Sequence, residues 1–532
     1  VEGDSLMARA VRRSNIDPVI ASFPVKCKAP DGSSVFEATS FFVNGAPAMR
    51  PHDPYGINSF GGFLSTTVNY VAGCSLLSGV EAFADNVSVL SSLSFTLTTR
   101  FGGYLINKDT PYTALARRSL MLLPREVMMP RLCDSRIGTV PVAFVKFSDR
   151  EQEAKAVYYA CRWNLKPSDP AAFAAGKLTT PERPIVFYVD DTFPAGWYDA
   201  IRRGLLSWNA AFEKIGYRDA VQVRPYPRDD ASFDPNDIKF SCVKYANTMG
   251  ESLSSSARID PRSGEILRTT VMVCHNMTWE MPFEIFVFTA HADPSVRQRY
   301  MPDSTLFEHV KNHFTWLTGV DCFGMSYNLT SSAAFPSDSL RHNAAFTRKY
   351  GTTPSMLDIA KYNFIAPIDA VKKGFRITPT GVGEYDYHVV KCLYKPVPEA
   401  KTSEEELKVI EKWVDATVGN PVYRYENAKD CPDCGANDVG DDDIKNFKYA
   451  LGTLRYCMEN FDKWISDEDD PEYLYRNGIY NYLYRRYKQL LTQVAITAYG
   501  VKTYERKAND PVPSYEFTPY AEQKEALDIL YA

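Results

Sequence analysis

The sequence predicts an α+β protein with a β-rich N-terminal domain, a central α/β domain with a mixed sheet, and a helical C-terminal part. Residues before about 165 form strand-like runs with few helical periods. Short apolar strands then alternate with amphipathic helices, and the last quarter carries long helical periods. At roughly 150 residues per domain, a chain of 532 residues predicts three or four structural units. We place them at residues 1–175, 176–400 and 401–532.

The composition is that of a chain with large packed cores. Apolar residues make up 45% of the sequence and aromatic residues 13%, which excludes global disorder. The net charge of −5 comes without a large block of one sign, so no nucleic-acid groove is expected. No run of 18 apolar residues occurs, so we expect no transmembrane segment in the visible chain. The 11 scattered cysteines favour buried free thiols over a disulfide framework.

The N-terminal domain is predicted from successive strand-like runs. Val35–Val43 alternates loosely, and Val87–Thr99 is a long run of small, apolar and β-branched residues. Thr139–Phe147 and Ala156–Trp163 have the same character. Prolines cluster near both ends of Lys166–Pro184, which predicts a linker or surface crossing and sets the first domain boundary.

The central domain is expected to follow a β–α–β–β order. Ile185–Val189 is a short buried-strand run, and Pro194 opens an amphipathic stretch that Gly216 ends as a C-cap. A strand over Ile238–Tyr245 follows. The hairpin over Ala257–Cys274 turns at D-P-R-S-G and is expected at the edge of the sheet.

Further helices are predicted beyond this hairpin. One opens at Thr305, where Glu308 completes a capping box, T-L-F-E. A long helix over Ile444–Ile465 follows the acidic residues 441–443, which are favourable at a helix N-terminus. The Tyr-rich stretch 473–487 predicts a helix whose tyrosines pack against its own domain, with a protein interface as the alternative.

Five long segments of the chain are characteristic of one protein family. They are P-I-V-F-Y-V-D-D-T-F-P-A-G-W (184–197), G-L-L-S-W-N-A-A-F-E-K-I-G-Y (204–217), I-D-P-R-S-G-E-I-L (259–267), N-L-T-S-S-A-A-F-P-S-D-S-L-R (328–341) and G-T-T-P-S-M-L-D-I-A-K-Y-N-F-I-A-P (351–367). These segments resemble the large exported zinc-dependent metalloproteases of Gram-negative bacteria, whose catalytic domain is metzincin-like. The resemblance runs from about Asn15 onward. It implies export, with a periplasmic, outer-membrane or cell-surface location.

The resemblance also implies which positions carry the family's chemistry. Family members place H-E-x-x-H-x-x-G-x-x-H just before the segment that begins here at Asn328, and a gapless count aligns this motif with residues 317–327. In the family, three histidines bind zinc, the glutamate polarises water and the glycine breaks the helix. The residues at these positions are Leu317 and Asp321 for the first two ligands, Thr318 for the base, Gly324 for the break and Tyr327 for the third ligand.

These substitutions predict the loss of zinc catalysis. Leucine has no lone pair, threonine is no carboxylate base, and Asp and Tyr offer hard oxygens that do not recreate a three-histidine site. The family's Met-turn aligns with 355–359, where Leu357, next to Met356, occupies the methionine position and Ile359 that of a tyrosine. We therefore expect no bound zinc, no catalytic residue and a pseudoenzyme.

The first function class is an exported pseudo-metalloprotease that binds a peptide or protein, or acts as a scaffold. Metzincin-like clefts hold a substrate backbone along an edge strand, and the hairpin 257–274 occupies the corresponding place. Retention of these residues for folding alone is the opposing interpretation. The candidate substrate-binding residues are Arg258, Ile259, Glu265 and Ile266.

Two other classes stay open. His309 and His313 stand at i and i+4 on one helix, with Asp321 on the same face, which permits a displaced metal site and an active metallopeptidase. A structural role in a cell-envelope assembly, with protein partners, is the third class. Cys431-Pro-Asp-Cys434 has the spacing of half a zinc knuckle, but no second pair follows and an ordinary loop is favoured. G-V-G-E-Y-D (381–386) lacks the dinucleotide fingerprint.

Overall fold

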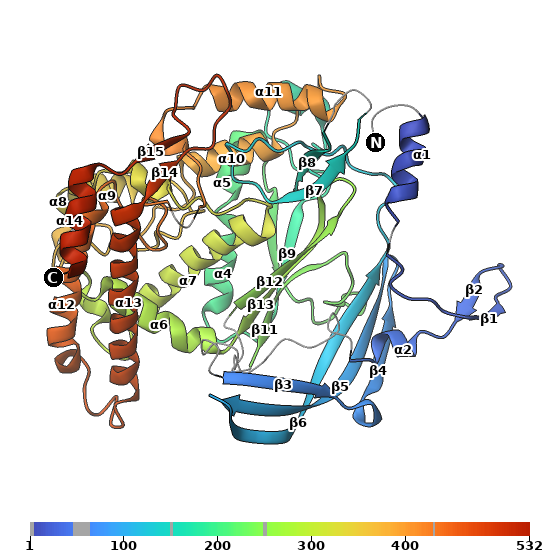
Figure 1. The fold of residues 1–532 in the computed structure, drawn as a ribbon, viewed down its shortest axis with the longest axis horizontal. Helices are drawn as coiled ribbons and strands as arrows, with labels where there is room; N and C mark the ends of the chain where they lie inside the picture. Colours follow the sequence, from blue (N-terminus) through green and yellow to red (C-terminus); the bar gives the residue numbers. More distant parts are fainter. Residues whose placement is uncertain are drawn as a thin grey trace.

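The computed structural model describes residues 5–16, 18–45, 64–148, 153–247, 253–428 and 431–531. Figure 1 shows an N-terminal β-sheet in blue at the lower right, a central sheet in green, and helices in orange and red at the left. The predicted α+β organisation, β-rich at the front and helical at the end, is confirmed. No helix among the described residues is long and apolar enough to cross a membrane.

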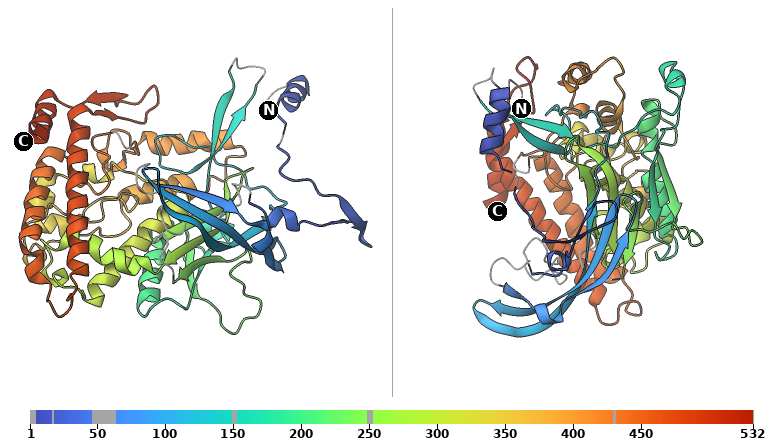
Figure 2. Two further views of the ribbon diagram at one scale, coloured as in Figure 1. Left: turned by 60° about the horizontal axis from the view of Figure 1, so that its bottom comes forward. Right: turned by 90° about the vertical axis from the view of Figure 1, so that its right-hand side faces the viewer.

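The N-terminal region is dominated by one long antiparallel hairpin. β5 pairs with β6 along its length, while β3 and β4 pair with the two halves of the other edge of β5. The left view of Figure 2 shows that β1 and β2 extend away from the rest of the protein. The elements are α1 (Ser5–Ser14), β1 (Val25–Lys28), β2 (Ser34–Phe36), α2 (Thr39–Phe42), β3 (Leu64–Tyr70), β4 (Leu76–Ala82), β5 (Asn86–Phe101), β6 (Tyr104–Met121), β7 (Pro141–Lys146) and β8 (Lys155–Ala160).

The strand predicted over Val35–Val43 is wrong, whereas Val87–Thr99 lies within β5 as expected. β2 ends at Phe36, and the carboxylate of Glu37 accepts a hydrogen bond of 2.8 Å from the backbone N–H of Thr39. This contact starts the helical turn α2.

The central sheet has the strand order β10-β9-β11-β13-β12. Its strands are β9 (Ile185–Val189), β10 (Val221–Pro225), β11 (Ser241–Ala246), β12 (Leu253–Asp260) and β13 (Glu265–Cys274). The first four in spatial order are parallel, and β12 is the antiparallel edge strand. The expected edge hairpin is therefore confirmed. Helices α4 (Trp197–Leu206) and α7 (Asp303–Leu317) lie side by side on one face of the sheet (Figure 1).

Two helix predictions in this region need correction. The single helix expected after Pro194 is divided into α4 and α5 (Asn209–Lys214) at residues 207 and 208, where the hydroxyl of Ser207 donates to the carbonyl of Gly204 at 2.6 Å. The capping box at Thr305 does not form. α7 already begins at Asp303, and Glu308 binds Lys311 at 2.7 Å instead of reaching back to the helix start.

The C-terminal part is mainly helical. Its long helices α12 and α13 pack together, and the carboxylate of Asp442 caps α12 by accepting the N–H of Lys445 at 2.9 Å. Tyr475 and Tyr482 of α13 pack on Phe283 of α6, which belongs to the predicted central domain and not to the C-terminal part. The other tyrosines of this stretch that are exposed are Tyr473, Tyr480, Tyr484 and Tyr487, so the prediction that this helix packs its tyrosines against its own domain is corrected. The remaining elements are α3 (Pro170–Ala174), α6 (Asn276–Thr289), α8 (Ser337–His342), α9 (Ala344–Tyr350), α10 (Glu384–Tyr394), α11 (Ser403–Asp415), α12 (Asp443–Trp464), α13 (Leu474–Tyr499), β14 (Val501–Thr503), β15 (Tyr515–Phe517) and α14 (Tyr520–Tyr531).

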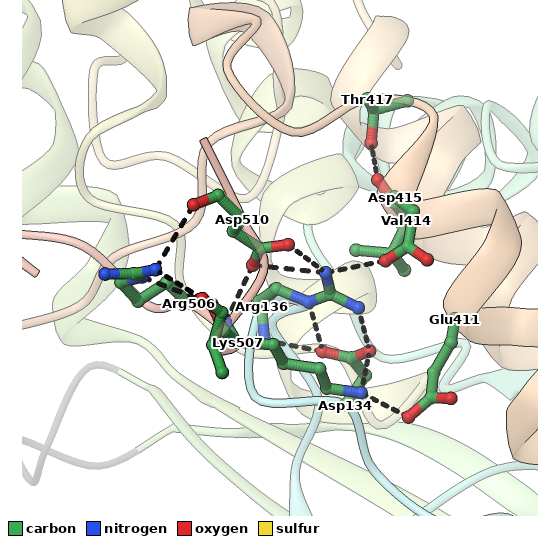
Figure 3. Close-up of polar contacts among 10 residues, drawn as sticks. Asp134, Arg136, Glu411, Val414, Asp415, Thr417, Arg506, Lys507 and Asp510 are labelled. Carbon is green, nitrogen blue, oxygen red and sulfur yellow. Dashed lines mark hydrogen bonds and ion pairs between the residues drawn. The ribbon is translucent and has the colours of Figure 1, made fainter. Parts of the chain in front are cut away.

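A charged network joins the segment before β7 to the C-terminal part. Figure 3 shows the guanidinium of Arg136 between three carboxylates. Its Nη atoms lie 2.7 Å from Asp134, 2.8 Å from Asp415 and 3.0 Å from Asp510. Lys507 also binds Asp134, at 3.0 Å. Residues far apart in sequence are thus held together by charge-assisted hydrogen bonds.

Candidate functional site

The aligned motif positions lie where α7 ends. A single π-helical turn, Thr318–Cys322, continues α7, and the chain then turns away at Gly324, whose φ is +70°. The last carbonyls are capped by side chains, because Trp163 Nε1 donates to Cys322 O at 2.7 Å. A Cβ on Gly324 would collide with the carbonyl of Cys161, so only glycine fits the break.

The side chains at the first-ligand and general-base positions are enclosed. Leu317 belongs to the main hydrophobic core and is 1% exposed. Thr318 is equally buried, and its hydroxyl donates to the carbonyl of Phe314 one helical turn back. Leu317 has no lone pair, and Thr318 presents a buried hydroxyl, which is no carboxylate base, at the end of the helix.

Asp321 and Tyr327 form a small polar group between the π-turn and the edge strand β12. Ser255 of β12 hydrogen-bonds to the carboxylate of Asp321, while partial burial raises the pKa of that carboxyl. Tyr327 is half-buried against Trp316, with ring centroids 5.7 Å apart. Burial raises the pKa of Tyr327, and the charge of Asp321 raises it further, as expected for two neighbouring acidic groups.

The turn at the Met-turn position is held from below by α10. The carboxylate of Asp386 accepts hydrogen bonds from Ser355 Oγ at 2.6 Å and from Met356 N at 2.8 Å. Burial raises the pKa of Asp386 to about 6. Leu357 is fully buried, and its Cδ2 lies 2.7 Å from where a Cβ on Gly319 would be. The Leu357 side chain therefore fills the space beneath the π-turn.

Zinc, the metal that the resemblance implies, does not fit this donor set. The aligned ligand positions hold an alkyl chain, one carboxylate and one phenol whose pKa is raised above its usual range. Zinc peptidase sites use three protein ligands, mostly nitrogen, and a base for the bound water. The base position holds Thr318, whose hydroxyl is already engaged with the helix backbone.

The displaced histidine pair is enclosed on α7. His309 packs on Tyr362 with centroids 5.3 Å apart, and burial lowers its pKa to about 4. His313 packs on Trp316, and burial lowers its pKa well below the usual value. Both line a cavity of about 20 Å³, which has room for roughly one water molecule.

Asp321 does not join these histidines in a group with metal-ligand spacing. Within the described ranges, the group of three His, Cys, Asp or Glu side chains with such spacing is Cys431, Asp433 and Cys434. The turn predicted as an ordinary loop thus brings two thiols and a carboxylate together. The C-x-x-C spacing is the sequence signal for this group, and Asp433 adds a carboxylate between the two thiols.

The four candidate substrate-binding residues lie on the β12–β13 hairpin. Ile259 pairs with Ile266 across the hairpin, and a register shift separates Arg258 from Ile259. Glu265 and Ile266 are buried, and the N–H of Ile266 donates to Arg162 O at 2.8 Å. Arg258 is exposed. Of the four, only Arg258 presents its side chain fully to solvent.

Sequence reasoning also missed Asp386 and Ser255. Asp386 belongs to G-V-G-E-Y-D, which lacks the dinucleotide fingerprint, and nothing local indicates that its carboxylate reaches residues 355 and 356. Ser255 gave no signal, because a serine in an edge strand is common.

Two family models match the chain. Residues 321–532 match the family described as Met-zincin, and residues 1–168 match one described as Domain of unknown function (DUF5117). The first match includes the helix break, Tyr327 and the turn at 355–359. No curated protein and no solved structure matches the chain.

Proposed function

We propose that this chain, which carries a metzincin-like domain, is an exported homologue of zinc metalloproteases that lacks zinc catalysis and binds peptide or protein segments. The observation that carries the proposal is the state of Leu317 and Thr318. Leu317 has no lone pair and is packed in the core, and Thr318 is a buried hydroxyl rather than a carboxylate, so neither supplies the ligand or the base of a zinc peptidase site.

The ligand would bind along β12. This strand is the edge of the central sheet, and an extended segment can add to such an edge through backbone hydrogen bonds. β12 runs past the π-turn, where Ser255 meets Asp321. A bound segment would therefore lie beside the degenerate motif, as a substrate lies beside zinc in the family.

The position of Asp321 supports binding over hydrolysis. A single carboxylate next to Tyr327 can accept a hydrogen bond from a peptide N–H, but the aligned positions do not supply the three ligands and the base of a zinc peptidase site. Arg258, exposed on the same strand, would favour an acidic residue in the ligand. A displaced His309/His313 metallopeptidase and a purely structural cell-envelope role are the other outcomes of the test.

The proposal is tested by measuring peptide binding and proteolysis on the same preparation. We expect binding to a panel of extended peptides and denatured proteins, without chelator-sensitive cleavage. Ser255→Asp, which places a second carboxylate beside Asp321, should weaken binding at least about tenfold. Ser304→Asp, on an exposed turn of α7, is the matched control and should bind as the parent does.

Two results would contradict the proposal. Cleavage that a chelator abolishes, together with loss of bound metal in His309→Ala, would establish a metallopeptidase. A folded protein that binds no member of the panel would remove the peptide-binding role and leave the structural one.

A further inference from the structure

We propose that Cys431, Asp433 and Cys434 bind one thiophilic divalent cation, Zn²⁺ in the first place, at a site that takes no ligand from the degenerate motif. One ligand atom from each of the three side chains lies within 4.8 Å of the others. All three residues are buried, the two cysteines to 2% exposure. This site is independent of the peptide-binding proposal.

The local backbone forms a tight turn of the kind that presents two thiols to one ion. The N–H of Cys434 donates to Cys431 O at 3.1 Å, so the turn closes within the C-x-x-C segment. Gly435 follows, and a Cβ there would collide with the side-chain amide of Gln493. The spacing C-x-x-C is the one that zinc knuckles use.

The two thiols already point into the group. Cys431 Sγ donates to Asp433 Oδ1 at 3.0 Å, and the Cys434 side chain hydrogen-bonds to Cys431. A divalent cation would replace these two thiol protons. Two S–metal bonds and one O–metal bond would form, and two protons would pass to solvent, as metal binding by cysteine requires.

A second layer of groups compensates the charge that results. Two thiolates and one carboxylate exceed the charge of the cation by one. Arg424 binds Asp433 through both Nη atoms and lies 3.8 Å from Cys431 Sγ, while Lys502 lies 3.7 Å from Asp433. Hydrogen-bonded outer groups of this kind orient ligands and tune the metal.

The ligand types favour a soft ion. The cysteines also pack on Leu329, with Tyr327 and Ile359 at the margin, so part of the surroundings of the sulfurs is apolar. Thiolate ligands select Zn²⁺ over Mg²⁺ or Ca²⁺. Three protein ligands leave a fourth position for water or an added ligand. Bound cation would connect this turn to β14, because Arg424 also donates to Thr503 O at 2.9 Å.

The test uses the full chain, reduced and freed of metal, and titrated with Co²⁺ and then Zn²⁺. We expect one Co²⁺ per chain, a thiolate-to-cobalt charge-transfer absorption, and its loss when Zn²⁺ is added. Cys431→Ser and Cys434→Ser should each weaken Co²⁺ binding at least about 100-fold. Asp433→Asn, which keeps an oxygen for Arg424, should weaken it less.

Controls separate this site from others. Cys74→Ser, which changes an exposed free thiol, should bind Co²⁺ as the parent does. His313→Ala should also leave the cobalt spectrum unchanged. If a cysteine variant fails to fold, alkylation of the parent chain tests the site instead. Bound Zn²⁺ should protect Cys431 and Cys434 from the alkylating reagent.

Three results would overturn the proposal. The first is a chain that is fully reduced and binds no cobalt. The second is a Cys431–Cys434 disulfide in the protein as purified, shown by a mass lower by two hydrogens and by thiols that resist alkylation until reduced. The third is cobalt binding that survives Cys431→Ser and Cys434→Ser but is lost in His313→Ala, which would place the metal on α7.

Discussion

Arg131 holds Glu406 through two parallel hydrogen bonds in the protein interior. Nε lies 3.0 Å from Oε2 and Nη2 lies 2.5 Å from Oε1, and both side chains are almost fully buried. The same guanidinium donates to the carbonyls of Cys392 and Lys395. This one arginine therefore attaches the segment before β7 to α10 and α11.

Removing Glu406 should be strongly destabilising, because it leaves a buried guanidinium without its counter-charge. We expect Glu406→Ala to lower the free energy of unfolding by about 3–5 kcal/mol. Urea denaturation followed by circular dichroism measures this change. Glu404, on the same helix, is exposed, so Glu404→Ala should leave the free energy of unfolding within about 0.5 kcal/mol of the parent. An equal loss in both variants would contradict the buried ion pair between Arg131 and Glu406.

The network of Figure 3 predicts unequal roles for two carboxylates that bind the same arginine. The side chain of Asp510 is 8% exposed, whereas that of Asp415 is 58% exposed. Asp415→Ala should cost at most about 1 kcal/mol, because exposed ion pairs contribute little. Asp510→Ala should cost clearly more. Denaturation midpoints of the two variants give the comparison, and a reversed order would show that the network is not rigid in solution.

The packing of Leu357 beneath the π-turn can be tested by its volume. Leu357→Ala should destabilise the protein by about 2–5 kcal/mol, because a cavity opens next to Gly319. Leu357→Met, which introduces the residue that the resemblance implies at this position, conserves volume and should cost less than about 1.5 kcal/mol. Thermal unfolding in parallel distinguishes the two, and equal losses would show that the side chain is not tightly packed.

Buried His309 predicts a loss of stability in mild acid. Its pKa falls from 6.5 in the unfolded chain to about 4 in the fold, because burial disfavours the charged ring. Below pH 6.5 the unfolded chain therefore binds more protons at His309 than the folded chain does. The contribution of neutral His309 to the free energy of unfolding is complete above pH 6.5 and is lost as the pH falls toward 4. His309→Gln should remove about 3 kcal/mol of this pH dependence.

Unfolding curves recorded between pH 7 and pH 4 provide the measurement for His309. His342→Gln, at an exposed position on α8, is the control and should leave the slope of stability against pH as it is in the parent. An unchanged slope in His309→Gln would mean that the ring is hydrated in solution.

Elements with strong local signals were predictable from the sequence. Ile185–Val189 forms β9 with the expected bounds, because a short apolar run suits a strand buried on both faces. The long helix α12 begins one residue before its predicted start, where Asp442 caps it. The capping box at Thr305 failed because a pattern of four residues does not reveal that Pro302 already starts the helix.

The resemblance predicts where the site lies, but it does not predict the contacts that form it. Gapless counting placed Gly324 at the helix break, which the structure has. Three contacts of the two sites join residues that no local pattern connects. They are the hydrogen bond from Met356 to Asp386, the contact between Ser255 and Asp321, and the ion pair between Arg424 and Asp433. Such contacts depend on how separate elements pack, so single-sequence reasoning had no access to them.

The helix break at Gly324 depends on backbone contacts, since its carbonyl accepts the N–H of Val140 at 2.8 Å and its Cα faces Cys161. No side chain at positions 317, 321 or 327 is needed to shape it. The path of the chain at this turn is therefore independent of the chemistry at those three positions. Exchanging their side chains should change what the turn can bind without changing its shape.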